Sequence, residues 1–169
     1  VAKLLQVGYP GGPIIDQLAR EGDPTYIAFP RTYLDRDQFE FSFSGIKTSV
    51  RTYLTKQSAE RIDRDLPHIA ASFQEAVVDV LVDKTIAAAK SRHTSSILIT
   101  GGVACNSRLR DRMTAQGAEH NVRVTIPPPI LCTDNGAMIA AVGSFYFIQG
   151  RKDELDLTVN PRATLKTAS

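Results

Sequence analysis

The sequence predicts an α/β domain built around a central sheet, and three observations lead to that prediction. Residues 96–100 and 122–126 are short apolar runs rich in β-branched side chains, which is typical of strands. Gly101 and Gly102 directly follow the first run and mark a tight turn. Apolar side chains spaced three and four apart, as on one face of a helix, precede, separate and follow the two runs. Strands and helices in this order indicate an α/β fold.

The expected helices follow one another along the chain. Residues 1–5 resemble the tail of an amphipathic helix that stops at Gly8, so the chain is expected to be part of a longer one. Pro13 suits the first turn of the next helix, where its missing N–H costs no hydrogen bond. Residues 151–169 are expected to form a frayed tail. The helices are expected to cover residues 13–22, 45–54, 67–91, 103–113 and 134–150.

The segment between the first two of these helices is expected to be mostly loop. Residues 23–40 are polar and contain prolines, which predicts loop or edge structure. Phe39, Phe41 and Phe43 alternate with polar residues, and this period of two predicts a short strand. Ser44 is then placed to cap the helix that follows.

Composition and charge narrow the classes of protein. The chain has 169 residues, 43% of them hydrophobic, which suits one globular domain with a core. Its 20 Lys and Arg against 18 Asp and Glu give a net charge of +2, so nucleic acid would have to bind a local patch. Cys105 and Cys132 lack zinc-ligand spacing and are expected to be reduced core residues. The apolar run at 136–148 is too short for a bilayer and no signal peptide opens the chain, so a cytoplasmic protein without a membrane span is expected.

The strongest local signal is the turn at Gly101 and Gly102. Two glycines between a strand and a helix let the backbone approach a ligand, and the N–H groups at the helix start suit a phosphate or carboxylate. Asn106 is expected in the first helical turn, where its amide could bind a ribose or a base. The alternative is a tight turn with no ligand, because the sequence is not a complete phosphate-loop pattern.

A second signal precedes the last helix, where Asp134 is a candidate metal ligand. The alternative is that Thr133 or Asp134 caps the helix. One carboxylate does not make a metal site, and His68 and His93, expected as surface or capping residues, show no metalloprotease spacing.

Two further positions have open alternatives. Gly12 could let the chain pass against a ligand, and Asp16, one turn later, could hold ribose hydroxyls or only interact with a helix dipole. Lys47 near a helix start could meet a phosphate, although a solvated lysine is the favoured interpretation.

Five segments taken together resemble the TsaD family of tRNA adenosine threonylcarbamoyltransferases, formerly described as O-sialoglycoprotein endopeptidases. The resemblance implies an actin/Hsp70-like (ribonuclease H-like) nucleotide-binding fold of two lobes. The 169 residues would be most of the C-terminal lobe, with helical insertions, and the first lobe would be absent. The segments are residues 9–13, 41–48, 70–74, 101–106 and 132–138.

The resemblance also implies a reaction and its ligands. Threonylcarbamoyl-AMP would bind between the lobes and pass its threonylcarbamoyl group to N6 of adenosine 37 of tRNA. Gly12, Asp16 and Asn106 match adenylate-binding positions, and Asp134 matches a ligand of one divalent metal, iron or zinc. The other metal ligands of the family, a histidine pair in the first lobe, have no match in this sequence. No catalytic side chain is identified, and the chain alone is expected to be inactive.

The implied partners are tRNA and, in bacteria, a TsaB-like paralogue and a TsaE-like ATPase, with a homo- or heterodimer as a further possibility. Three other functions stay open at this stage. One is the metalloendopeptidase activity of the older description. Another is a related sugar or acetate kinase that uses an ATP-like ligand. The third is a non-catalytic scaffold.

Overall fold

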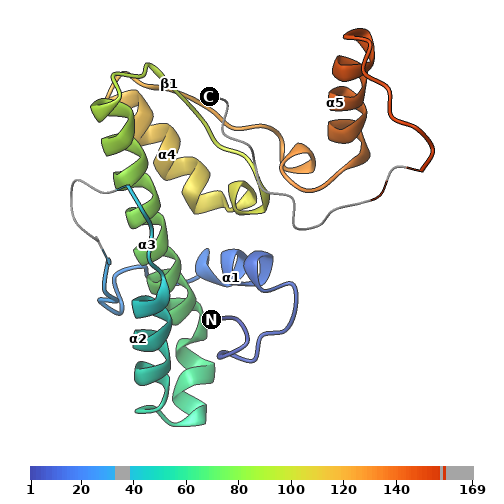
Figure 1. The fold of residues 1–169 in the computed structure, drawn as a ribbon. Helices are drawn as coiled ribbons and strands as arrows, with labels where there is room; N and C mark the ends of the chain where they lie inside the picture. The colour runs from blue at the N-terminus through green and yellow to red at the C-terminus, as the bar shows by residue number, and fades with distance from the viewer. Residues whose placement is uncertain (33–38, 157, 159–169) are drawn as a thin grey trace. The chain divides into compact units, whose positions relative to one another are not determined.

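The computed structural model describes residues 1–32, 39–156 and 158, and its chain forms two compact units (Figure 1). The first unit is Val1–Thr133 and the second is Asp134–Ser169. The predicted α/β class is confirmed in the first unit, which combines helices with a small parallel sheet.

The longest helix, α3 (Ala59–Ser91), has 33 residues and forms the centre of the first unit. The expected start at Pro67 is wrong, because the helix begins eight residues earlier, at Ala59. Ser58 caps this end by accepting a hydrogen bond from the N–H of Arg61 at 3.3 Å. Pro67 lies inside the helix and removes one backbone hydrogen bond. Packing of the fully buried Ile69 just beyond it offsets that loss.

Three shorter helices surround α3: α1 (Gly11–Ala19), α2 (Ser44–Leu54) and α4 (Ser107–Glu119) (Figure 1). Because neighbours cover it on several sides, the apolar surface of α3 is wider than one amphipathic stripe. Three groups of buried side chains form the core: Leu5, Ile15, Ala19, Ile69, Ala70 and Ala71; Val78, Val82, Ile86, Leu109 and Met113; and Phe29, Ile46, Val50 and Ala76.

The sheet consists of β1 (Ser96–Leu98) and β2 (Arg123–Thr125), which pair in parallel with Ile97 opposite Val124. The 3-10 helix η1 (Gly102–Cys105) and α4 form the crossover between them. A side chain at Gly117 of α4 would collide with Val124, so α4 lies close on the sheet. The prediction of a buried first strand is wrong: Leu98 is 67% exposed, since no described element covers that face.

The predicted strand at residues 39–43 is also wrong. These residues form neither strand nor helix up to the start of α2, and no described segment pairs with them. Phe41 and Phe43 instead stack on each other, with ring centroids 6.1 Å apart. Alternating side chains make a strand only beside a partner strand. The predicted loop is confirmed over residues 23–32, and residues 33–38 lie outside the described part of the chain.

Two helices of the first unit begin at other residues than expected. α1 starts at Gly11, two residues before Pro13, and α2 starts at Ser44 itself, so Ser44 is its first residue and not its cap. The expected helix over residues 103–113 is replaced by η1 and then α4, which starts at Ser107. Residues 1–8 make a single hydrogen-bonded turn in place of a helix tail.

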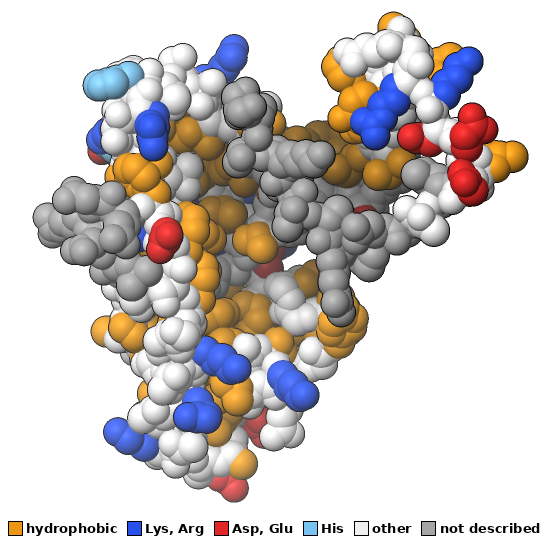
Figure 2. Space-filling model, viewed as in Figure 1, with side chains coloured by type: hydrophobic (Ala, Val, Ile, Leu, Met, Phe, Trp, Pro, Cys, Tyr) orange, Lys and Arg blue, Asp and Glu red, His pale blue; other side chains and the backbone are white. Residues whose placement is uncertain are grey.

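The second unit contains α5 (Gly136–Ile148), whose apolar side chains are largely exposed (Figure 2). Asn135 caps it by accepting from the N–H of Met138 at 3.0 Å, so the alternative that Thr133 or Asp134 is the cap is wrong. No helix in the described residues is long and apolar enough to cross a membrane. Residues 151–156 form no helix or strand, and most of the expected tail lies outside the described residues.

Candidate functional site

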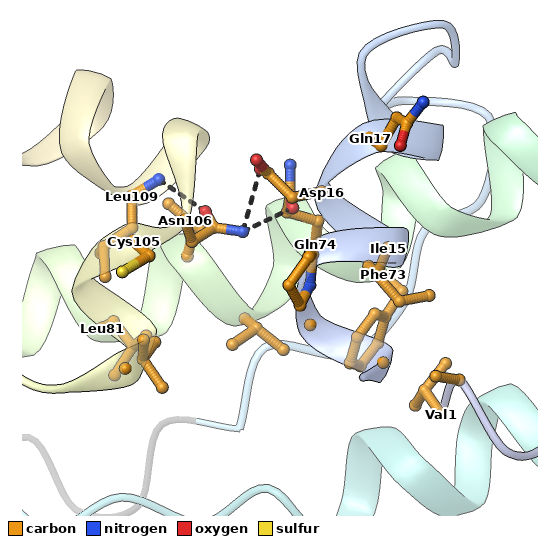
Figure 3. Close-up of a pocket in the computed structure, with 18 of the residues that line it drawn as sticks. Val1, Ile15, Asp16, Gln17, Phe73, Gln74, Leu81, Cys105, Asn106 and Leu109 are labelled. Carbon is orange, nitrogen blue, oxygen red and sulfur yellow. Dashed lines mark hydrogen bonds between the residues drawn. The ribbon is translucent and has the colours of Figure 1, made fainter. Parts of the chain in front are cut away.

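A pocket of about 820 Å³ lies in the first unit, where α1, α3 and the turn from η1 into α4 meet (Figure 3). Four of the five predicted substrate-binding residues line it: Gly12, Asp16, Gly102 and Asn106. They come from segments about ninety residues apart, and the fold brings them together. Gly101 is adjacent to the lining. The volume lies within the range of about 300–1,000 Å³ that is usual for small-molecule sites.

Asp16 is the polar centre of the pocket wall and is only 7% exposed. Its Oδ1 accepts from the Asn106 amide at 3.1 Å, and from the backbone N–H and the hydroxyl of Ser107 at 3.2 and 2.8 Å. Its Oδ2 accepts from Arg20 at 3.1 Å. Because Ser107 is the first residue of α4, the carboxylate lies at the positive end of that helix. Asp16 thus interacts with the dipole of α4 and joins α1 to α4.

Asn106 is the N-cap of α4, not a residue of its first turn as expected. Its Oδ1 accepts from the N–H of Leu109 at 2.9 Å. Its Nδ2 donates to Asp16 and, at 2.7 Å, to Oε1 of Gln74 on α3 (Figure 3). Both hydrogens of the amide are therefore used within the protein.

The rest of the lining is largely apolar. Phe73, Val77 and Leu81 follow one another at four-residue spacing on α3, and Val103 and Leu109 come from η1 and α4. Among the lining residues the charged side chains are Asp16 and Arg20, which are paired. A flat, mostly apolar ring with polar substituents suits such a surface.

The two glycines of the turn differ in backbone conformation. Gly101 has φ +86° and ψ 170°, a conformation that residues with a side chain rarely adopt. A methyl group added at Gly102 would meet no atom within 4 Å, and the same holds at Gly12. The backbone of Gly101 explains the turn, whereas Gly102 and Gly12 leave open space beside the pocket.

Ion pairs fix α4 on α3 behind the pocket. Arg108 binds Glu75 at two points, and one turn later Arg112 binds Asp79, which also accepts from Arg31. The hydrogen bond from Arg108 is the main cause that lowers the pKa of Glu75, with burial acting in the opposite direction. These pairs tie α4 to α3 at two successive turns.

The other predicted site residues lie elsewhere. Asp134 is exposed at the start of the second unit, and Lys47 is exposed on α2, as favoured for a solvated lysine. Cys132 is buried as expected, but Cys105 is half-buried and lines the pocket. Nδ1 of His68 accepts a hydrogen bond from the backbone N–H of Asp23 at 2.9 Å and so joins α3 to the loop that contains Asp23. Within the described residues, no group of three or more His, Cys, Asp or Glu side chains could hold a metal.

Three polar side chains beside the Asp16–Asn106 pair were not predicted from the sequence. Gln74, Ser107 and Arg20 all bond to the Asp16–Asn106 pair. A signal existed for Gln74, because it lies in the segment 70–74, one of the five that carry the resemblance. Nothing comparable pointed to Arg20, four residues after Asp16 on an exposed helix face.

The pocket opens beyond the carboxyl end of β1, where α/β domains commonly bind small ligands. The fold and the site therefore define an α/β domain with a pocket for a small molecule. The chain belongs to the TsaD family, tRNA N6-adenosine threonylcarbamoyltransferase, whose family profile matches residues 1–141.

Curated relatives carry the same description. The chain is 46% identical to a tRNA N6-adenosine threonylcarbamoyltransferase of Syntrophus aciditrophicus over 167 residues, which cover 99% of this chain and 49% of the relative. It is 48% identical to that of Desulforapulum autotrophicum, with coverage of 96% and 48%. For Geobacter metallireducens the identity is 46%, with coverage of 99% and 50%. The chain spans about half the length of these relatives.

Proposed function

We propose that this chain is the C-terminal half of a tRNA N6-adenosine threonylcarbamoyltransferase, and that its pocket binds the adenylate part of threonylcarbamoyl-AMP. One observation carries the proposal: Gly12, Asp16, Gly102 and Asn106 line a single pocket within residues 1–141, which the family profile matches. The two-lobed actin/Hsp70-like fold, with these residues in the second lobe, is part of the same proposal.

The pocket supports adenylate binding in two ways. The apolar surface of Phe73, Val77 and Leu81 offers a face for the purine. The backbone at Gly101 and Gly102 leaves room for the phosphate, since no side chain stands there. The exposed guanidinium of Arg20 is held by Asp16 at the rim of the pocket and could offset phosphate charge.

The proposed reaction is a transfer of an acyl group. N6 of adenosine 37 attacks the carbonyl carbon of the threonylcarbamoyl group, the bond from that carbon to the phosphate oxygen breaks, and AMP leaves. The attacking nitrogen loses one proton. The nucleophile comes from tRNA, so the protein needs no nucleophilic side chain. The role of this half is to hold the adenylate so that its mixed anhydride is presented to the tRNA.

A divalent metal, iron or zinc, is proposed to bind Asp134. The described residues do not fit a metal on their own, because no group of three or more His, Cys, Asp or Glu side chains among them could hold one. Its other ligands would have to come from the half of the enzyme outside this chain. No step of the reaction is therefore derived through the metal.

Further partners are proposed from the resemblance. tRNA is the acceptor, and a TsaB-like paralogue and a TsaE-like ATPase would accompany the enzyme in the cytoplasm of bacteria. A homo- or heterodimer is part of the same proposal. These proposals concern the complete protein, because the chain spans about half of its relatives.

The test uses the completed enzyme, meaning these 169 residues preceded by the half that the relatives have in addition. We expect it to convert unmodified tRNA when given threonylcarbamoyl-AMP, and to bind AMP by calorimetry. Asp16→Asn and Gly102→Leu should weaken AMP binding. Cleavage of casein that a chelator stops, or phosphorylation of a sugar by ATP without tRNA, would contradict the proposal if tRNA stays unmodified.

A further inference from the structure

We propose that Gln74 is a positioning residue of the adenylate pocket: its side-chain oxygen fixes the Asn106 amide and so sets the position of the 101–106 turn. The proposal rests on the proposed function and extends it to a residue on α3. Gln74 is 8% exposed and lines the same pocket. It accepts from Nδ2 of Asn106 at 2.7 Å, the shortest contact of that amide.

The orientation of both amides follows from a backbone group. The N–H of Leu109 can only donate, so the atom of Asn106 that faces it must be the oxygen. The nitrogen of Asn106 then faces Gln74 and Asp16, and both must accept. The atom of Gln74 that points at Asn106 is therefore its oxygen.

This chain of bonds joins three helices at one amide. Asn106 caps α4, Asp16 belongs to α1 and Gln74 belongs to α3. The turn of residues 101–106 has a second attachment, since Arg110 donates to the carbonyl of Ala104 at 2.8 Å. Gln74 is the link from the turn to α3, the central helix of the first unit.

The hydrogen bonds of Asn106 favour a positioning role for Gln74 over direct binding of the ligand by the Asn106 amide. With both N–H groups donating within the protein, Asn106 has only the second lone pair of Oδ1 to offer a ligand. Loss of the Gln74 oxygen frees one N–H and lets the amide rotate. Asn106 then loses its cap geometry, and Gly102 and Val103 shift along the pocket wall.

The experiment compares Gln74→Met with Gln116→Met in the completed enzyme. Methionine keeps the length of the side chain and removes the oxygen. Gln116 lies on α4, and its side chain donates to the nearby Glu119, away from the pocket lining, so it controls for the substitution itself. We expect Gln74→Met to weaken AMP binding and to raise KM for threonylcarbamoyl-AMP about tenfold, about the value of one hydrogen bond, with a smaller change in kcat. Gln116→Met should leave both unchanged.

Gln74→Glu supplies a readout that loss of packing alone would not give. The carboxylate would keep an acceptor for Asn106 but would lie beside Asp16, since both accept from the same Nδ2. The other charged groups around it are Arg20, Glu75, Arg108 and Asp111, and the first three are already paired. Two acidic groups at one amide favour protonation. AMP binding by Gln74→Glu should therefore recover as the pH is lowered, whereas that of Gln74→Met should not.

Hydrogen exchange separates the positioning role from the proposed function. Gln74→Met should speed exchange of the Leu109 amide, which Asn106 protects, without changing amides in the middle of α3. If the Leu109 amide exchanges at the wild-type rate while AMP binding is weaker, Gln74 contacts the ligand directly. If the Leu109 amide exchanges faster while AMP binding is unchanged, Gln74 has no role in the pocket. Either result overturns the proposal. If the wild-type enzyme modifies no tRNA, the proposed function fails, and exchange and AMP binding still decide the role of Gln74.

Discussion

Arg108 of α4 and Glu75 of α3 form a two-point ion pair, with Nε to Oε2 at 2.6 Å and Nη2 to Oε1 at 2.7 Å. Arg108 is two residues after Asn106, and Glu75 is the residue after Gln74. The pair therefore fixes the start of α4 against α3 at the place where the pocket amides meet. A planar guanidinium binds a carboxylate in this way, and a lysine does not.

Arg108→Lys should destabilise the first unit by about 1 kcal/mol, because it keeps the charge and loses the paired geometry. Urea unfolding followed by circular dichroism checks this at neutral pH.

Since Arg108 lowers the pKa of Glu75, the pair stabilises the fold above the ordinary glutamate range, about 4.3, and that contribution is lost as the pH falls. Glu75→Gln should accordingly lose less stability than wild type on acidification. Equal acid sensitivity of the two proteins would contradict this.

Asp65 makes the stability of the fold depend on pH in a second range. It accepts from Arg64 at 2.8 Å and from the hydroxyl of Tyr26 at 2.8 Å, and these bonds, chiefly that of Arg64, lower its pKa to about 2. An aspartate in an unfolded chain titrates near 3.9. The folded state is thus favoured above about pH 4, and this advantage is lost between about pH 4 and 2. Thermal unfolding of Asp65→Asn should change less over that interval than wild type does, and a steeper decline in the variant would refute the assignment.

The class of fold could be predicted from the sequence because it depends on local patterns. The strand, the Gly101–Gly102 turn and the next helix are contiguous in the sequence, and their order fixes the parallel crossover. Gly12, Asp16 and Asn106 could be placed at one site only through the resemblance. Nothing in their own spacing says that α1 packs against the start of α4.

Features that depend on distant contacts could not be predicted. The spacing of Phe73, Val77 and Leu81 indicates a helix face toward a core, yet these side chains are half-buried and line the pocket. Periodicity shows which side chains share a face, and not whether protein or ligand covers it. The start of α3 was misplaced for a related reason: proline suits the first turn of a helix, which favoured a start at Pro67, yet Pro67 lies inside α3.

The glycine turn allows folding and ligand binding to be tested separately. Gly101→Ala should destabilise the first unit by about 1–3 kcal/mol, because φ +86° with ψ 170° is a strained conformation for alanine. Gly102→Ala should change stability little, since its methyl group would meet open space. In the completed enzyme, Gly102→Leu is then expected to weaken AMP binding without loss of stability. Denaturation midpoints and calorimetry measure the two effects, and a Gly102→Leu protein that binds AMP normally would move the ligand away from this turn.

The isolated 169-residue chain should bind metal weakly and transfer nothing to tRNA. Within the described residues no group of three or more His, Cys, Asp or Glu side chains could hold a metal, and the proposed metal site needs side chains from the other half. Calorimetry with Fe(II) and Zn(II), together with a modification assay on unmodified tRNA, checks both statements. Turnover by this chain alone would show that the active site is misplaced.

Asp134 and Asn135 are neighbours with separable roles. Asn135 caps α5, so Asp134→Ala should leave the helix intact and abolish metal retention by the completed enzyme. Asn135→Ala should instead cost about 1 kcal/mol of stability through loss of the cap and retain the metal. Metal content measured by elemental analysis, beside thermal unfolding of both variants, distinguishes the two residues. If Asp134→Ala keeps its metal, the carboxylate is not a ligand, and the proposed metal site has to be sought among residues outside this chain.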